Sequence, residues 1–251
     1  MKALITGASS GIGRSIAYEL AKHGYDLIIV ARNIDKLNEV KNSINNVKVD
    51  VIQMDLSNYE NCKMLYEKVK QEHIDILVNN AGFGVFGSFC ETDIEKEVNL
   101  INTNITAVHV LTKLFLQDMV KRDSGYILNV ASIAGFMPGP LMTAYYSSKA
   151  YVVRMSQSIY EELKRAKSNV KIGILCPGPV NTNFNNVADV KFKAKSLSSE
   201  YVAKFAVEKV LKGKFYIIPG IEIRALRILA KIVPDRILGK FAYNVQVRKR
   251  N

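Results

Sequence analysis

Short apolar runs rich in leucine or β-branched residues recur along the chain, each far enough from the next to leave room for one helix. They are Ala3–Thr6, Asp26–Ala31, Val47–Gln53, Ile74–Asn79, Gly125–Val130, Val170–Cys176 and Phe215–Ile218. Their interiors are apolar without clean alternation, which is typical of strands buried on both faces. Amphipathic stretches such as Arg14–Lys22, Asp35–Ile44 and Cys62–Glu72 lie between them. The alternation predicts an α/β fold with a doubly wound parallel sheet and right-handed crossovers.

The chain has 251 residues, a length that suits one large α/β domain, and it contains neither repeats nor a linker rich in Pro, Gly or Ser. We therefore expect a single domain over residues 1–251. The three cysteines, Cys62, Cys90 and Cys176, share no metal-ligand spacing, so no metal site is expected. No apolar run approaches the ~20 residues of a membrane span, and the first residues lead directly into a strand. These features predict a cytoplasmic location.

A glycine-rich turn, Thr6–Gly13, joins the first run to the helix that follows it. Glycines allow a tight turn and let the backbone approach a pyrophosphate, which then faces free N–H groups at the helix N-terminus. A purely structural turn is the alternative. The turn also fits the G-x-S-x-G pattern of a hydrolase with Ser9 as nucleophile, but the later histidines, His73 and His109, fall in or at the end of helical stretches. We therefore reject the hydrolase.

The end of the second run favours NADP over NAD. An acidic residue there would bind the adenosine ribose and repel a 2′-phosphate, whereas this chain has Ala31 followed by Arg32. A guanidinium binds phosphate in a fork, and the hydroxyls of Ser9 and Ser10 add donors from the glycine turn. An ordinary solvated charge at a helix start is the alternative for Arg32.

Several polar residues are expected near the carboxyl ends of the strands. Tyr145 and Lys149 are four residues apart at the start of a helix running to about Lys164, so they share a face, and a cation near a phenol favours its phenolate. Tyr146 is three residues from Lys149, and spacing alone does not choose between the two tyrosines. Ser132 follows the fifth run, Asn79–Gly82 ends the fourth, and Asn104 falls in a helical stretch, 91–120, that is otherwise apolar on its inner side.

Taken together, these residues resemble the short-chain dehydrogenase/reductase family over about residues 1–218. The motifs that carry the resemblance are TGASSGIG at Thr6–Gly13, NNAG at Asn79–Gly82, Asn104, Ser132, Tyr145-x-x-x-Lys149 and PGPVNT at Pro177–Thr182. No single motif is decisive, but the ordered set is highly specific. The resemblance implies a Rossmann-like seven-stranded sheet in the order 3-2-1-4-5-6-7 and hydride transfer to or from nicotinamide.

The resemblance also implies roles for the residues. Tyr145 would be the general acid of the reduction, Ser132 would bind the substrate oxygen, and Lys149 would hold the nicotinamide ribose and lower the tyrosine pKa. Asn104 would anchor a water that connects Lys149 to solvent. The expected cofactor contacts are Gly7, Ser9, Ser10, Gly11, Ile12, Gly13, Arg32, Asp55, Leu56, Asn80, Ala81, Gly82, Tyr145, Lys149, Pro177, Gly178, Val180 and Thr182.

Two apolar loops, Phe83–Phe89 and Ile133–Met142, are expected at the same edge and suit either an apolar substrate or simple packing. Residues 183–198 are expected to form a substrate lid. The prediction is therefore an NADP(H)-dependent oxidoreductase acting on a ketone or secondary alcohol, with a hydrophobic carbonyl compound as the expected substrate. The alternative is a catalytically silent nucleotide-binding sensor or scaffold on the same fold. A homodimer or homotetramer is expected, and no nucleic-acid-binding module is recognised.

The C-terminal segment 219–251 is expected to be a helical extension. It holds eight basic and two acidic residues, a net charge of +6 out of +12 for the whole chain. Arg224, Arg227 and Lys231 are spaced to share one helix face. Such a helix is expected to cover its own core or an oligomer seam; contact with an anionic membrane or an acidic partner is the alternative.

Overall fold

The computed structural model describes residues 1–182 and 196–247. The strands of the main sheet are β1 (Lys2–Thr6), β2 (Asp26–Ala31), β3 (Val49–Gln53), β4 (Ile76–Asn79), β5 (Tyr126–Val130), β6 (Lys171–Leu175) and β9 (Tyr216–Ile217). The helices are α1 (Gly11–Lys22), α2 (Ile34–Asn42), α3 (Tyr59–Val69), α4 (Ile94–Ile101), α5 (Ala107–Lys121), α6 (Thr143–Arg165), α8 (Ser199–Leu211), α9 (Ile221–Ile232) and α10 (Asp235–Val247).

The main sheet has seven parallel strands in the order β3-β2-β1-β4-β5-β6-β9. The predicted α/β fold and its strand order are therefore confirmed, with β9 in the seventh position. Each predicted apolar run coincides with one strand: β1 begins one residue before its run, β2 has the same bounds, and the other five strands are one or two residues shorter than their runs. Ile5 of β1 lies opposite Ile29 of β2 on one side and Val78 of β4 on the other, so the central strands meet through apolar residues at this register.

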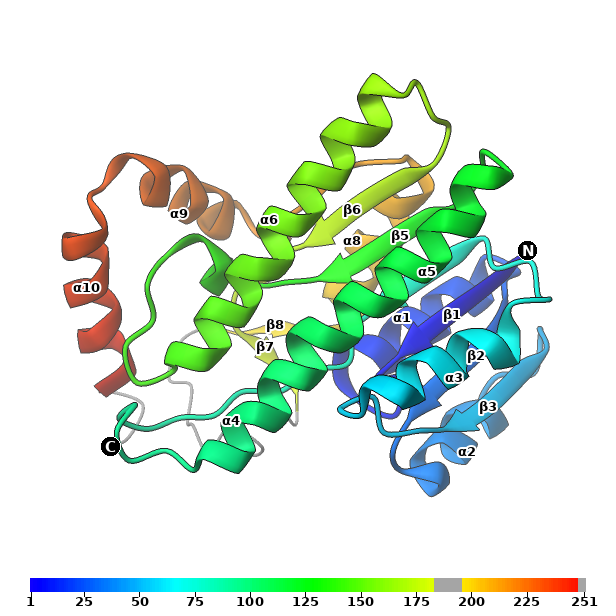
Figure 1. Ribbon diagram of the computed structural model, residues 1–251, viewed down its shortest axis with the longest axis horizontal. Coiled ribbons are helices and arrows are strands. Elements are labelled where there is room, and N and C mark those ends of the chain that lie inside the picture. Colours follow the sequence, from blue (N-terminus) through cyan, green and yellow to red (C-terminus); the bar gives the residue numbers. More distant parts are fainter. Residues whose placement is uncertain (183–195, 248–251) are drawn as a thin grey trace.

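Helices cover both faces of the sheet, which makes three layers (Figure 1). Ile5 packs in one buried cluster with Ile16 of α1 and Val207 of α8. The next residue back, Leu4, points to the opposite face and packs in a second cluster with Leu65 of α3. Because successive side chains of a strand alternate between faces, a run that is apolar at every position needs helices on both sides.

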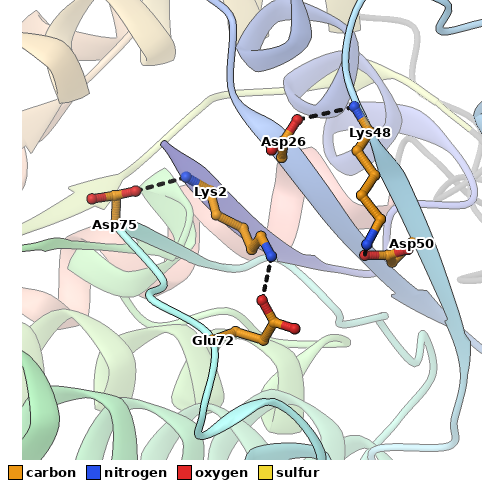
Figure 2. Close-up of polar contacts among 6 residues, drawn as sticks. All are labelled: Lys2, Asp26, Lys48, Asp50, Glu72 and Asp75. Atoms are coloured by element: carbon orange, nitrogen blue, oxygen red, sulfur yellow. Dashed lines mark hydrogen bonds and ion pairs between the residues drawn. The ribbon is translucent and has the colours of Figure 1, made fainter.

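Charged side chains pair at the amino ends of the first four strands. Figure 2 shows six of them: Lys2, Asp26, Lys48, Asp50, Glu72 and Asp75. The backbone N–H of Lys2 donates to Asp75 Oδ2 at 2.6 Å, and that of Lys48 donates to Asp26 Oδ1 at 3.0 Å. These contacts tie the strand beginnings to their neighbours, and they lie at the edge of the sheet away from the predicted site.

The C-terminal extension forms α9 and α10, which lie at the end of the molecule away from β1, β2 and β3 (Figure 1). The expected basic face of α9 turns partly onto the body: Arg224 Nε donates to the Ile218 carbonyl at 3.0 Å, and the Arg227 guanidinium lies 3.6 Å from the centroid of the Tyr216 ring. Ile228 and Ile232 remain 59 % and 75 % exposed. No helix in the described part of the chain is long and apolar enough to cross a bilayer.

The predicted lid, 183–198, lies mostly outside the described residues. Its last two residues form β8 (Leu197–Ser198), which pairs in parallel with β7 (Val180–Asn181). Ser198 also caps α8, because its side chain accepts a hydrogen bond from the Tyr201 N–H at 3.1 Å.

Candidate active site

A cleft of about 530 Å³ lies along the carboxyl ends of the strands. Ligand pockets commonly have volumes of roughly 300–1,000 Å³, and open α/β sheets bind ligands at this edge. Every site residue expected from the sequence lines the cleft except Gly13 and Asn104. The structure therefore brings together motifs from residues 7 to 182 in one place.

The glycine turn has the backbone shape that an anion cradle needs. Gly7 and Gly11 have φ angles of +65° and +54°, which favour glycine, and a Cβ on Gly13 would lie 2.4 Å from the Gly7 carbonyl oxygen. Ser10 precedes α1 without making a side-chain cap, and the first turn of the helix carries no acidic residue. The backbone N–H groups at the N-terminus of α1 are thus available to an anion, and the pyrophosphate of a dinucleotide fits this position.

Asn80 holds this turn against the end of β4. Its Nδ2 donates to the Thr6 carbonyl at 3.0 Å and to the Gly7 carbonyl at 3.1 Å. The Thr6 hydroxyl accepts from the backbone N–H groups of Asn80 and Ala81 at 3.0 and 3.1 Å. The end of the neighbouring strand therefore fixes the conformation of the glycine turn. The NNAG motif has this structural role in addition to lining the cleft.

The far end of the cleft carries two cations. Arg32 is exposed at the end of β2, and Lys36 lines the cleft from the first turn of α2. Asn33 caps this helix by accepting from the Lys36 N–H at 2.9 Å. Sequence reasoning missed Lys36, although its position four residues after Arg32 at a helix start was a usable signal. Two cations at this point fit a phosphorylated ribose.

Asp55 and Leu56 line the same part of the cleft, beyond β3. The Asp55 carboxylate accepts from the Ser57 N–H at 3.0 Å, while Leu56 is buried. Pro177, Gly178, Val180 and Thr182 close the cleft beyond β6. A Cβ on Gly11 would lie 3.1 Å from Thr182 Cγ2. The glycine turn and the PGPVNT motif, which are far apart in the sequence, therefore approach each other at the cleft.

Ser132, Tyr145 and Lys149 converge in the centre of the cleft. Tyr145 and Ser132 share a side-chain hydrogen bond, and Ser132 Oγ also accepts from the Ala134 N–H at 3.2 Å. Lys149 Nζ lies 5.8 Å from the centroid of the Tyr145 ring and donates to the Val130 carbonyl at 2.9 Å. The helical spacing of four residues places the ammonium beside the phenol, as expected.

Burial sets the protonation of this pair. It raises the pKa of Tyr145 to about 12, with the Ser132 hydrogen bond acting in the opposite direction. It lowers the pKa of Lys149 to about 8, and the nearby Cys176 opposes this. Loss of water around the phenol is the largest influence on the pKa of Tyr145, and the Ser132 hydrogen bond is the one that lowers it. That Lys149 lowers the tyrosine pKa stays a prediction. Tyr145 is a neutral phenol at neutral pH and can donate a proton.

Asn104 lies behind the cleft wall and not in it. It is fully buried, its Oδ1 accepts from the Phe83 N–H at 3.1 Å, and its Nδ2 donates to the Phe83 carbonyl at 2.9 Å and to Ser148 Oγ at 3.0 Å. A Cβ on Gly82 would lie 2.8 Å from Asn104 Oδ1 and 3.5 Å from Lys149 Nζ. Asn104 therefore supports the backbone beside Lys149.

The helical stretch that carries Asn104 contains a change of helix type. A π-helical turn, Asn102–Thr106, separates α4 from α5. One extra residue in the turn rotates the helix that follows and frees local backbone groups, and such turns are frequent at functional sites. The predicted helical stretch over 91–120 is confirmed from Ile94 onward, but periodicity does not reveal the single added residue of the π-helical turn.

The remaining wall of the cleft is apolar. Phe83, Met137 and Met142 come from the two loops expected at this edge, whereas Phe89 is 62 % exposed and lies outside the cleft. Sequence reasoning missed the residues that the C-terminal extension contributes: Ile223, Leu226, Phe241, Ala242 and Val245. Their sequence pattern is amphipathic, but it does not say which element the apolar side covers.

Comparison with known proteins agrees with this arrangement. The family model described as short chain dehydrogenase matches residues 1–191. The chain is 32 % identical to 17-beta-hydroxysteroid dehydrogenase type 3 of Rattus norvegicus over 247 residues, which cover 94 % of this chain and 77 % of that protein.

Two solved structures have nearly the same fold. A short-chain dehydrogenase from Sphingobium yanoikuyae in complex with NADPH has a TM-score of 0.84, 27 % identity and 92 % coverage of both chains. A short chain dehydrogenase/reductase from Burkholderia phymatum in complex with NAD has a TM-score of 0.83 and 25 % identity, and covers 90 % of this chain and 91 % of that one. With this match to its sequence and its fold, the chain belongs to the short-chain dehydrogenase family of oxidoreductases.

Proposed function

We propose that this oxidoreductase is NADP(H)-dependent and transfers hydride between nicotinamide and a hydrophobic ketone or secondary alcohol. The observation that carries the proposal is the convergence of Ser132, Tyr145 and Lys149 in a cleft that continues to the glycine turn at one end and to an apolar wall at the other. A catalytically silent sensor would not need the hydrogen-bonded Ser132–Tyr145 pair at this position.

The residues present fit a dinucleotide, because the uncapped N-terminus of α1 suits its pyrophosphate and Arg32 with Lys36 suits a 2′-phosphate. A bound nicotinamide supplies the hydride that adds to the carbonyl carbon. Ser132 donates a hydrogen bond to the carbonyl oxygen and orients it toward Tyr145. The neutral phenol of Tyr145 then gives its proton to that oxygen as negative charge develops there, and the ammonium of Lys149 stabilises the phenolate left behind.

The apolar lining supports a hydrophobic substrate. Phe83, Met137 and Met142 line the cleft together with Leu226 and Phe241 of the C-terminal extension. Apolar walls with few polar groups are typical of pockets for apolar ligands. The relative named as a hydroxysteroid dehydrogenase is consistent with a substrate of this class.

The direct test is NADPH oxidation over a panel of ketones, from short diketones to long acyl chains. We expect turnover to rise with apolar size, and we expect Tyr145→Phe to lower kcat by about 10²–10⁴-fold because the proton donor is lost. Lys113→Ala, a charge change on α5 outside the cleft, is the control. Equal rates for Tyr145→Phe and the natural protein would refute the mechanism, and no turnover of any ketone would favour the sensor.

Cofactor preference has its own test. Arg32→Ala is expected to raise the KM for NADPH by about tenfold or more, since it removes a charge-assisted contact to the 2′-phosphate, and to change the KM for NADH by less than about twofold. Lys36→Ala is expected to act in the same direction. Lys41→Ala, near the other end of α2, is the matched control. A similar loss with both cofactors would contradict the phosphate role.

Two surfaces support proposals about partners. Ile94, Val98 and Ile101 are spaced four and three residues apart on α4, so they share one face. They are 66 %, 42 % and 42 % exposed, which supports association with a second copy.

The exposed apolar side of α9 lies instead in the strongly basic segment 219–251. We propose that this side contacts an anionic membrane surface, with the rest of the protein in the cytoplasm.

A further inference from the structure

Tyr146 brings a second phenol into the substrate part of the cleft. Its ring centroid lies 6.0 Å from that of Tyr145, with the ring planes at 76°. The backbone of Gly139 lies against the ring, because a Cβ at Gly139 would be only 2.0 Å from Tyr146 Cγ. Met142 and Phe86 pack in the same cluster. The ring is therefore held in place beside the predicted proton donor.

The hydroxyl of Tyr146 is held by a residue one hundred positions further along the chain. Gln246 of α10 is 1 % exposed, and its Nε2 donates to Tyr146 Oη at 2.8 Å. Gln246 Oε1 is buried and has no partner among the described residues. A buried amide oxygen without a partner lowers the stability of the fold. Stability alone therefore does not explain why Gln246 is buried against Tyr146.

The direction of that hydrogen bond decides what Tyr146 can do. Its oxygen accepts from Gln246, so its own proton is left for another acceptor. No residue in the described ranges accepts this proton. Burial raises the pKa of Tyr146 above its usual value, and the Gln246 bond opposes this, so the phenol is protonated at neutral pH. Tyr146 is thus an oriented donor in a pocket whose other nearby walls are Phe241, Ala242 and Val245.

We propose that Tyr146, positioned by Gln246, is a second polar subsite that donates a hydrogen bond to a substrate oxygen other than the reacting carbonyl. The ligand class is a hydrophobic ketone with a second acceptor oxygen near the reactive group, as in a keto ester or a diketone. This proposal rests on the proposed reductase function. It adds that the pocket binds a ketone with a second acceptor oxygen more tightly than a ketone of similar size without one.

The test compares a medium-chain methyl ketone with a β-keto ester of the same number of heavy atoms, using NADPH as cofactor. The natural protein is expected to favour the keto ester. Tyr146→Phe keeps the ring that fills the space at Gly139 and removes only the hydroxyl. We expect it to raise the KM for the keto ester by about tenfold, to leave kcat nearly unchanged, and to alter the methyl ketone by less than about twofold.

Gln246→Leu is expected to give a smaller loss, about threefold, in the same KM and for the keto ester alone, because the phenol remains but is no longer oriented. The matched control is Tyr151→Phe, which removes a hydroxyl bonded to His109 Nδ1 at 2.7 Å on the same helix but outside the cleft. A change common to both substrates, or no change with Tyr146→Phe, would overturn the subsite while leaving the reductase intact. No turnover of either substrate by the natural protein would overturn both proposals.

Discussion

Lys149 couples the chemistry of the cleft to the stability of the fold. Its ammonium is buried with one backbone acceptor, the Val130 carbonyl, and burial lowers its pKa from 10.5 to about 8. Below pH 8 the group is charged in both the folded and the unfolded chain, and the folded state carries the cost of burying the charge. Between pH 8 and 10.5 the folded state has lost a proton that the unfolded chain still holds, so this contribution to the free energy of unfolding rises with pH.

We therefore predict that the stability of the natural protein relative to Lys149→Met increases by about 1 kcal/mol between pH 8 and pH 9, measured by urea unfolding without cofactor. The difference between the two proteins is needed, because Cys62 and Cys176 act with the opposite sign. Burial raises their pKa values to about 11 and about 12, so their contribution falls as the thiols of the unfolded chain ionise. A difference that stays constant across this range would mean that Lys149 is not desolvated.

The π-helical turn shows what one element contributes to the site. It places Asn104 where a single side chain satisfies both backbone groups of Phe83 and reaches Ser148 on α6. That contact joins the loop after β4 to the helix that carries Tyr145 and Lys149. The turn therefore connects the cofactor side of the cleft with the proposed proton donor.

Asn104→Ala is expected to lower the free energy of unfolding by about 3 kcal/mol, since it leaves the half-buried N–H and carbonyl of Phe83 and the buried Ser148 hydroxyl without this partner. Asn99→Ala is the matched control: this half-buried asparagine lies on the preceding α4, and within the described ranges its side chain accepts one hydrogen bond, from the Thr103 hydroxyl at 3.4 Å. We expect it to cost less than about 1 kcal/mol. Urea unfolding measures both, and equal losses would contradict the role assigned to Asn104.

The elements also show which parts of the structure were predictable. Buried parallel strands such as β2 need apolar residues at every position, so their number and approximate bounds follow from the sequence. The geometry of the glycine turn and of the Tyr145–Lys149 pair is determined by residues close together in the sequence, so both could be predicted. Two features depend on packing between distant segments: Asn104 is displaced by one added residue in a helix, and α10 reaches the cleft through Gln246. The amphipathic pattern of α10 does not show which part of the protein its apolar side packs against.

For the molecule as a whole, the distribution of charge separates two kinds of contact. The segment 219–251 has a net charge of +6, so pairing this segment with the same segment of a second copy would bring like charges together. Ile221, Ile228 and Ile232 of α9 are nevertheless 81 %, 59 % and 75 % exposed, with Lys231 exposed among them. An exposed apolar side with a cation beside it, in a segment of net positive charge, is complementary to an anionic lipid surface.

We predict that the protein sediments with vesicles containing phosphatidylserine at low salt and is partly released at high salt, since screening weakens the contribution of the exposed cations. The double variant Ile228→Asp, Ile232→Asp is expected to lower vesicle binding by about tenfold or more, because it places charge on the apolar side that enters the interface. Met64→Asp on α3, a site that is 52 % exposed, is the matched control. Ketone reduction by all three proteins checks that the cleft is intact. If the double variant bound vesicles as well as the control, or if it changed the oligomeric mass instead, the exposed side of α9 would belong to a protein interface.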